Sequence, residues 1–250
     1  IFGWSVPIHG VHEPLDDEIS ASLAAVEAAL NGVTTVVEAG TVADGDAVAR
    51  GLATVGLRAT IGVWGWDIEQ GPYAAPVDEV LERQRALVAA YPAGGLIEGW
   101  VTLVGHDLAS DRLLAGAADL ARELGTGMTM HLSPTSSDPE RYLERTGRRP
   151  IEHLDDLGVL GRHLLIGHGV WLDDAEVDLV LASGTAIAYC PWAYLRLGQG
   201  VFANSRHAEI VERGGRIAEF PRRRGRHTSG HCKGGHHEDV TRGPDRVQGF

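Results

Sequence analysis

The fold of this 250-residue chain is decided by three short apolar runs: Met128-Thr-Met-His131-Leu-Ser, Leu164-Leu-Ile-Gly-His168-Gly and Ala186-Ile-Ala-Tyr-Cys-Pro191. Each run has the length and composition of a buried parallel strand. The first two runs end in a histidine, and α/β barrels carry their chemistry at the downstream ends of the strands. The stretch therefore predicts a barrel with His131 and His168 at its mouth.

The segments around this stretch alternate between strand and helix patterns. Runs that favour strands lie at residues 33–37, 57–63 and 100–104. Apolar residues at helical spacing predict helices at residues 20–30, 43–55, 77–90, 111–124 and 173–182, with shorter ones at 139–145 and 150–157. Asp16 or Asp17 is expected to cap the first helix, and Asp173 or Asp174 lies near the start of the last long one.

This alternation indicates βαβ units and a parallel sheet. Six clear strands, with residues 216–218 as the start of another, favour a barrel over an open sheet. We therefore predict an α/β fold, a (β/α)8 TIM-type barrel over residues 1–218. The barrel is expected to be incomplete, with its first strand missing and its eighth-strand region degraded.

Residues 219–250 differ in kind from the rest. Residues 1–220 contain 15 Lys+Arg and 31 Asp+Glu, whereas residues 221–250 contain 7 and 3. The segment has few apolar residues and no period, so it cannot bury enough surface to offset its ordering entropy. We predict a basic, disordered tail; an anion-binding segment and a segment translated out of frame are the alternatives. Its histidines and Cys232 match no structural zinc spacing.

Bulk composition limits the partners and the compartment. A net charge of −12 argues against nucleic acid as a partner, because phosphate binding requires a basic surface. No apolar run approaches the roughly 18 residues that a membrane span requires. The two cysteines are too few for a disulfide framework, as expected in a reducing cytoplasm. We expect a cytoplasmic protein with a small-molecule substrate, and exposed sheet edges that favour a homo-oligomer.

His131 and His168 are the candidate catalytic pair. They lie 37 residues apart, which is about one strand–helix repeat and places them on neighbouring strands at the same end. Neutral imidazoles there can bind a divalent metal, which lowers the pKa of a bound water. The alternative is that each is a hydrogen-bonded core histidine.

Other residues near the predicted mouth are candidates for substrate contact. His106 follows the strand at 100–104, and its alternative role is in a turn or helix entry. Trp192 and Tyr194 lie in the loop after the 186–189 strand and can contact a planar ring, although loop packing also explains the tryptophan. Cys190 has no acid–base partner in sequence and is expected to be a small buried residue. Three further histidines are predicted to be structural and away from the mouth: His153, His163 and His207.

The longer blocks around these residues resemble a known family. They are Asn31-Gly-Val-Thr-Thr-Val-Val-Glu-Ala-Gly40, Thr126-Gly-Met-Thr-Met-His-Leu-Ser133, Gly161-Arg-His-Leu-Leu-Ile-Gly-His-Gly-Val-Trp-Leu-Asp-Asp-Ala-Glu176, Gly184-Thr-Ala-Ile-Ala-Tyr-Cys-Pro191 and Leu195-Arg-Leu-Gly-Gln-Gly200. Together they resemble the metal-dependent amidohydrolase superfamily, in particular its cytosine-deaminase-like and s-triazine or ethylammeline chlorohydrolase branch.

The resemblance implies one divalent metal, zinc or iron. It makes His131 the metal-ligand histidine of strand five, and His168 the strand-six histidine that binds metal or orients the attacking water. The family also has a His-x-His pair on strand one and an Asp that ends strand eight. Neither is present, since His9 and His12 are spaced His-Gly-Val-His and Glu219-Phe-Pro-Arg replaces Gly-x-Asp.

The general acid and base is a further departure. Many members of the branch have a glutamate three residues after the strand-five histidine, and Pro134 occupies that position here. Proline cannot transfer protons. The remaining candidates are more often loop or capping residues: Ser133, Thr135, Asp138 and Glu38.

Three hypotheses about function follow. The first is a fragment of a hydrolase that acts on carbon–nitrogen or related bonds of a small heterocycle through metal-activated water. The second is a non-catalytic barrel remnant that lacks a complete metal site. The third is a barrel enzyme that works without metal.

Overall fold

The computed structural model describes residues 5–39, 42–68, 71, 73–199 and 205–218. Its strands are β1 (Thr35–Val37), β2 (Arg58–Ile61), β3 (Ile97–Gly99), β4 (Val101–Gly105), β5 (Met128–Leu132), β6 (Leu164–His168), β7 (Ala186–Ala188) and β8 (Arg216–Ala218). Its helices are α1 (Ser5–His9), α2 (Pro14–Leu30), α3 (Gly45–Val55), α4 (Val77–Ala90), α5 (Asp111–Leu124), α6 (Asp138–Thr146), α7 (Pro150–Asp156), α8 (Asp174–Ser183), α9 (Pro191–Leu197) and α11 (His207–Glu212).

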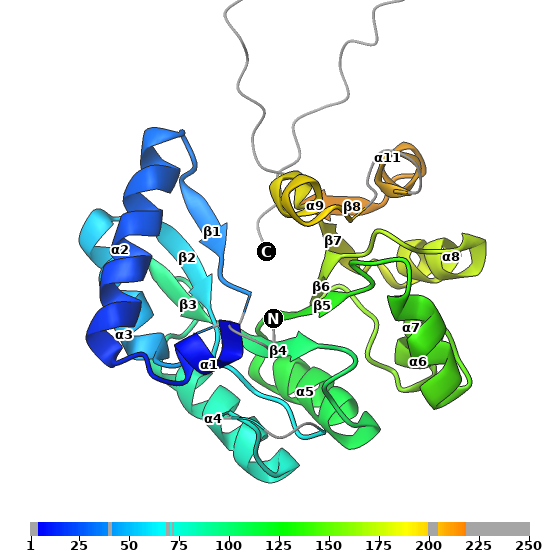
Figure 1. Ribbon diagram of the computed structural model, residues 1–250, viewed down its shortest axis with the longest axis horizontal. Helices are drawn as coiled ribbons and strands as arrows, with labels where there is room; N and C mark the ends of the chain where they lie inside the picture. Colours follow the sequence, from blue (N-terminus) through cyan, green and yellow to red (C-terminus); the bar gives the residue numbers. More distant parts are fainter. Residues whose placement is uncertain (1–4, 40–41, 69–70, 72, 200–204, 219–250) are drawn as a thin grey trace, which may run out of the picture. The chain divides into compact units, whose positions relative to one another are not determined.

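All strand pairs are parallel, and neighbours in space are neighbours in the chain (Figure 1). The strands form two ladders, β1-β2-β3 and β4-β5-β6-β7-β8, and only Trp100 separates β3 from β4. The Trp100 N–H donates to Ile61 O at 2.8 Å, and the next N–H, of Val101, donates to Gly127 O at 3.0 Å. The continuous segment of β3, Trp100 and β4 therefore bonds to β2 at its start and to β5 further along, and so joins the two ladders.

This strand order identifies the architecture. A doubly wound sheet reverses its order at a switch point, whereas a barrel keeps chain order throughout. The predicted α/β barrel fold is confirmed, including the strand at residues 216–218, which pairs with β7 through Ile187 and Ile217. Within the described ranges β1 and β8 each pair on one side only.

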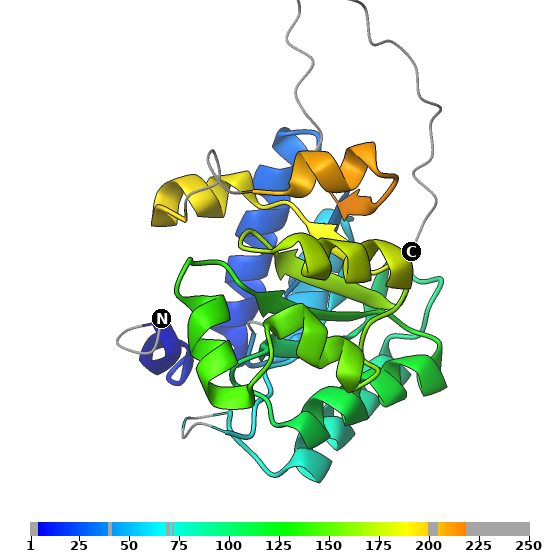
Figure 2. The same ribbon diagram turned by 90° about the vertical axis from the view of Figure 1, so that its right-hand side faces the viewer.

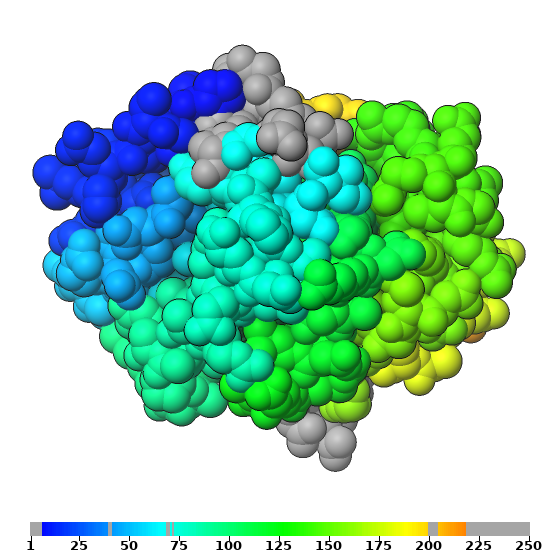
Figure 3. Space-filling model, turned by 90° about the horizontal axis from the view of Figure 1, so that it is seen from below, coloured from blue at the N-terminus to red at the C-terminus, as the bar shows by residue number. Residues whose placement is uncertain are grey.

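The main core lies between the strands and the helices outside them. Met128, Met130 and Leu132 alternate along β5 and pack with buried residues of α5, α7 and α8. Figure 2 shows the green and yellow-green helices of residues 138–183 in front of the strands. In Figure 3 the colours run in order across the surface, so successive segments of the chain lie side by side.

The opposite face of the strands forms a smaller cluster inside the barrel. Trp100 packs there with Leu165 and Ala186. A Cβ on Gly127 would lie 2.4 Å from the Trp100 ring, which no real contact allows. Glycine at this position is therefore required by the tryptophan that joins the two ladders.

Several predicted boundaries are wrong, each for a local reason. The first long helix begins at Pro14 rather than at residue 20, because proline fits the first helical position. Its N-cap is Glu13 rather than Asp16 or Asp17, and the Asp16 carboxylate accepts the Glu13 N–H at 2.9 Å. Residues 5–9 form helix α1 instead of a loop.

Residues 191–197, predicted as a loop, form helix α9, again with proline in the first turn. Other signals are confirmed: Gly125 ends α5 with φ of +64°, and the Asp173 carboxylate caps α8 through the Glu176 N–H. The predicted domain boundary falls at residue 218, which is the last described residue, and the predicted tail lies outside the described residues. Both therefore remain predictions. No helix in the described ranges has the length and apolar character that a bilayer crossing needs.

Candidate functional site

His131 is held in one tautomer near the end of β5. Its Nδ1 lies 2.5 Å from Val104 O on the neighbouring strand β4, and only a protonated nitrogen can donate to that carbonyl. In the neutral ring this leaves the lone pair on the other nitrogen, Nε2. A neutral imidazole with its second nitrogen bonded to a backbone carbonyl is the usual state of a histidine that binds metal.

His168 ends β6 and faces His131, with 5.2 Å between the ring centroids and 33° between the ring planes. The two are offset by one position, since His131 pairs with Gly167 and His168 with Leu132. Burial, and secondarily the electrostatic interaction with His131, lowers the pKa of His168 to about 4. The ring is thus neutral at pH 7, and its Nδ1 is buried with no hydrogen-bond partner in the described part of the chain.

The backbone turns sharply at both strand exits. Ser133 has φ of +46° and His168 has φ of +79°, and no other described non-glycine residue has a positive φ. By alternation His168 would face the outer helices with Leu164 and Ile166. We infer that the left-handed turn redirects its ring toward His131. Such conformations cost of order 1–3 kcal/mol each and cluster at functional sites.

Two side chains fix the His168 carbonyl. The Tyr194 hydroxyl donates to it at 3.2 Å, and His207 Nε2 lies 2.7 Å from it. His207 therefore carries its proton on Nε2, and its Nδ1 accepts from the Ser205 hydroxyl. The prediction that His207 lies away from the mouth is wrong. The sequence did not indicate the contact of His207 with His168, because residues 205–212 carry no strand pattern that would show where they lie.

His106 lies behind His131 rather than in an open pocket. Only 2 % of it is exposed, and its Nδ1 lies 3.2 Å from His131 O. Its ring packs on Tyr142 with 4.7 Å between centroids, and burial lowers its pKa. A neutral His106 is thus placed to support the β5 exit.

The two aromatic residues predicted to contact a planar ring, Trp192 and Tyr194, differ in exposure because they lie on helix α9. Tyr194 is 1 % exposed and lies against His168, with 5.6 Å between ring centroids. Trp192 is 76 % exposed, and among the described residues no ring contact or hydrogen bond joins it to the histidine pair. Cys190, which precedes them, is half-buried, and burial raises the pKa of its thiol, so it is not an activated nucleophile.

The acid–base candidates after β5 have structural partners. Asp138 accepts the Thr135 N–H at 2.7 Å and pairs with Arg141, so its carboxylate organises the start of α6. Ser133 is fully buried, and its hydroxyl has no hydrogen-bond partner among described residues. Of these three, only the Ser133 hydroxyl is unpaired and adjacent to the histidine strand.

The other two histidines predicted to be structural make ordinary contacts. His153 Nδ1 lies 2.8 Å from the Tyr142 hydroxyl, and its Nε2 lies 3.4 Å from Asp111. His163 lies at the start of β6, where Gly161 and the Arg122 guanidinium are its neighbours. Neither contacts His131 or His168 in the described structure.

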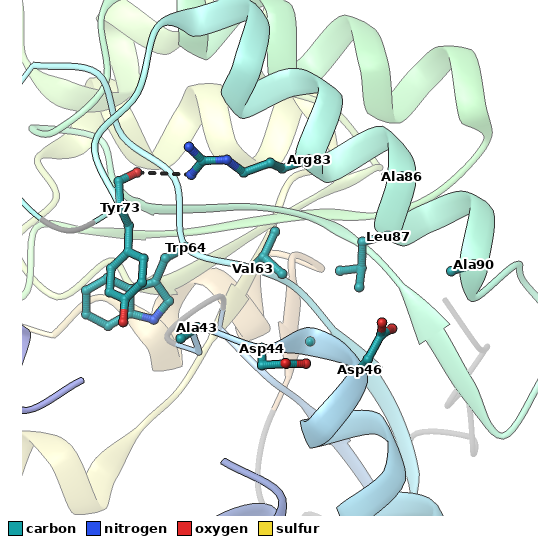
Figure 4. A pocket seen from close by; sticks show the side chains of 11 residues that line it. Ala43, Asp44, Asp46, Val63, Trp64, Tyr73, Arg83, Ala86, Leu87 and Ala90 are labelled. Carbon is teal, nitrogen blue, oxygen red and sulfur yellow. Dashed lines mark hydrogen bonds between the residues drawn. The ribbon is translucent and has the colours of Figure 1, made fainter. Parts of the chain in front are cut away.

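A hollow of about 380 Å³ between α3 and α4 shares no residue with the histidine pair (Figure 4). Its charged groups are already paired: Asp44 caps α3, Asp46 accepts the Tyr91 hydroxyl at 2.8 Å, and Arg83 bonds Glu79 and Tyr73 O. With its charges satisfied internally, this hollow offers little chemistry. The strand exits remain the candidate site.

Comparison with known sequences supports the family resemblance. A family model described as "Amidohydrolase family" matches residues 14–210. The 5'-deoxyadenosine deaminase of Methanopyrus kandleri is 31% identical over 194 residues, covering 78% of this chain and 43% of that enzyme. The 5-methylthioadenosine/S-adenosylhomocysteine deaminase of Aquifex aeolicus is 28% identical, covering 80% of this chain and 48% of that enzyme. The chain thus spans less than half the length of these relatives.

Solved structures agree on the fold. A variant of the atrazine chlorohydrolase TrzN from Arthrobacter aurescens TC1, complexed with zinc and atraton, matches with a TM-score of 0.76 at 19% identity over 87% of this chain and 51% of that one. An adenosine deaminase from Xanthomonas campestris with bound zinc gives 0.74 at 23% identity over 84% and 46%. At these identities the likeness concerns the fold.

Proposed function

The chain belongs to the amidohydrolase family, and we propose that it functions as a metal-dependent hydrolase that acts on a small heterocyclic substrate. The bond cleaved is a carbon–nitrogen bond outside peptides, or a related bond such as carbon–chlorine. Deamination is favoured among these reactions, because the two relatives described above are named as deaminases of adenosine derivatives. In that reaction water adds to the ring carbon and ammonia leaves.

The observation that carries the proposal is the state of the histidine pair. The Nδ1 of His131 is committed to Val104 O, so its Nε2 is an available ligand. The His168 ring is neutral, close to His131, and has a buried nitrogen without a hydrogen-bond partner in the described part. A buried, unpaired nitrogen beside a second available one fits a divalent metal, zinc or iron.

The residues have distinct tasks in this proposal. His131 and His168 would hold the metal, which would supply Lewis-acid chemistry that activates water near neutral pH. Tyr194 and His207 fix the backbone of His168 and thereby the position of its ring. His106 does the same for the β5 exit.

We assign substrate contact to the same region. Trp192 has an exposed ring on α9 that can stack on a planar heterocycle, whereas Tyr194 and His106, predicted from the sequence for the same role, are buried and support the histidines instead. Because Pro134 replaces the glutamate of related enzymes, proton transfer is not assigned to that position.

A metal and activity measurement tests the proposal. The purified chain is loaded with zinc or iron(II), and ammonia release is followed with adenosine, 5'-deoxyadenosine, S-adenosylhomocysteine and cytosine, with chloride release from a chlorinated s-triazine in parallel. Replacing a group that merely orients a metal ligand costs about 10–100-fold, so His131→Ala and His168→Ala should reduce activity and metal affinity by at least about 100-fold. His163→Ala, in the turn just before β6 and away from the pair, is the matched control.

The results separate the three hypotheses. Metal binding and turnover that both depend on His131 and His168 support the metal-dependent hydrolase. Full activity in strong chelator would indicate a barrel enzyme without metal. A folded chain that binds no stoichiometric metal and releases neither ammonia nor chloride would indicate a non-catalytic barrel remnant.

We further propose that the protein is cytoplasmic, with a small-molecule substrate and neither nucleic acid nor a membrane as partner. The acidic net charge and the low cysteine count support this. The edges of β1 and β8, paired on one side only in the described ranges, favour a homo-oligomer. Light scattering of the purified chain tests the last point.

A further inference from the structure

A second group of metal-binding side chains lies where α1 leads into α2. His9 ends α1, His12 lies in the turn between the helices, and Asp17 lies in the first turn of α2. One ligand atom from each residue lies within 4.8 Å of the others. We propose that His9, His12 and Asp17 form a second divalent metal site of the zinc type, which uses none of the residues assigned to the β5–β6 centre.

Two of the three ligands already have the required spacing. His12 Nδ1 and Asp17 Oδ1 are 3.3 Å apart. Bonds of about 2.0 Å in a tetrahedron place neighbouring ligand atoms roughly 3.3 Å apart. The nitrogen of His9 lies within 4.8 Å of both atoms, and a shift of about 2 Å completes the same tetrahedron.

His9 supplies an independent reason for a ligand. Its Nδ1 is buried and has no hydrogen-bond partner among the described residues. A buried polar atom without a partner costs free energy, and a bound cation satisfies an imidazole lone pair as a hydrogen-bond donor does. A simple His12–Asp17 ion pair explains the 3.3 Å contact but leaves this nitrogen unexplained.

The surrounding structure holds the three ligands in place. The Tyr73 hydroxyl donates to His9 O at 2.6 Å, and the His9 ring lies 5.4 Å from the Trp64 ring. Trp64 and Tyr73, which pack together as Figure 4 shows, come from the segment after β2. The Asp44 N–H donates to Asp17 Oδ2 at 2.9 Å, which leaves Oδ1 directed to the site.

The ligand set determines the chemistry. Two imidazoles and one carboxylate form the set that zinc takes in sites with one open position. A cavity of about 310 Å³ adjoins the three residues and has space for a fourth ligand. A metal there would connect the turn before α2 to the Trp64–Tyr73 segment and the start of α3, so we assign it a stabilising role.

Zinc binding to variants of the full chain tests the site. The parent carries His131→Ala and His168→Ala, so that the proposed catalytic centre does not contribute. His12→Ala or Asp17→Asn is then added, and Asp17→Asn keeps an oxygen for the Asp44 N–H. His163→Ala in the same parent is the control, and the tail histidines are identical in all four proteins.

We expect the parent to bind one more zinc ion than either site variant, with affinity lowered by at least about 100-fold on substitution. Cobalt(II) should give a tetrahedral absorption spectrum in the parent and the control alone. Zinc should raise the melting temperature of the parent but not that of the site variants. If either folded site variant binds zinc with the parent's stoichiometry and affinity, the assignment is wrong.

Discussion

Glu176 anchors the segment that follows His168, and its removal should destabilise the barrel. Its carboxylate is fully buried and accepts from Arg149 Nε at 2.9 Å and Nη2 at 2.7 Å, and from the Ile151 N–H at 3.0 Å and the Asp173 N–H at 3.2 Å. Arg149 also donates to Trp171 O, three residues after His168. One buried carboxylate thus ties α7, α8 and the exit of β6 together.

Glu176→Ala leaves the Ile151 and Asp173 N–H groups without their acceptor, whereas Arg149 keeps its ion pair with Asp173 Oδ2 at 2.7 Å. Burial raises the pKa of Glu176, and the bonds from Ile151 and Arg149 oppose that shift. A buried or half-buried donor left without an acceptor costs about 1–3 kcal/mol, so the two N–H groups together cost about 2–6 kcal/mol. In a folded part of this size that loss lowers the melting temperature by on the order of 10 °C. It is also a large fraction of a total stability of about 5–15 kcal/mol.

Thermal and urea denaturation followed by circular dichroism measure this effect. The matched control is Glu123→Ala, because Glu123 also pairs with an arginine through two hydrogen bonds but on the exposed surface of α5. That substitution should leave the melting temperature unchanged, since solvent screens exposed pairs. If the Glu176→Ala protein has the same melting temperature as the Glu123→Ala protein, the four hydrogen bonds do not anchor the β6 exit.

Three further outcomes follow from the structure. Gly127→Ala should lower stability by about 1–3 kcal/mol in urea denaturation, because its Cβ would meet the Trp100 ring at 2.4 Å; stability equal to wild type would contradict that contact. Tyr194→Phe removes a donor to His168 O, and one hydrogen bond is worth about 1 kcal/mol. The variant should stay folded and bind metal about 10-fold more weakly in calorimetry. Unchanged affinity would count against this role of Tyr194. Burial raises the pKa of the Cys190 thiol, so Cys190 should be alkylated slowly at pH 7 and faster as the pH rises above the ordinary thiol range. Peptide mapping measures the rate of alkylation, and rapid labelling at pH 7 would refute the prediction.

The sequence predicted the strands well because their signal is local. Runs such as 128–132 and 164–168 are apolar enough for parallel strands buried on both faces, and glycines end several of the helices between the strands. The short helices α1 and α9 were not predicted. A helix of five to seven residues is stabilised by what it packs against, and in α9 that contact is Tyr194 on His168, which sequence spacing does not show.

The candidate site was predicted at the level of residues but not of geometry. His131 follows from strand alternation, because Thr129 and His131 lie on the face opposite Met128 and Met130. His168 breaks that rule, since its φ of +79° is a backbone state that most non-glycine residues avoid and that periodicity cannot indicate. His207 comes from a distant segment and meets His168 only through the fold.

The two histidines are therefore positioned in different ways. His131 is placed by a regular strand and by the bond of its ring to Val104 O on the neighbouring strand. His168 occupies a left-handed backbone state that is stable only where its surroundings enforce it. Those surroundings include Tyr194 and His207 on its carbonyl, both of which lie beyond β7 in the chain. The geometry of the proposed metal site thus depends on Tyr194 and His207 as well as on the two strands that carry its ligands.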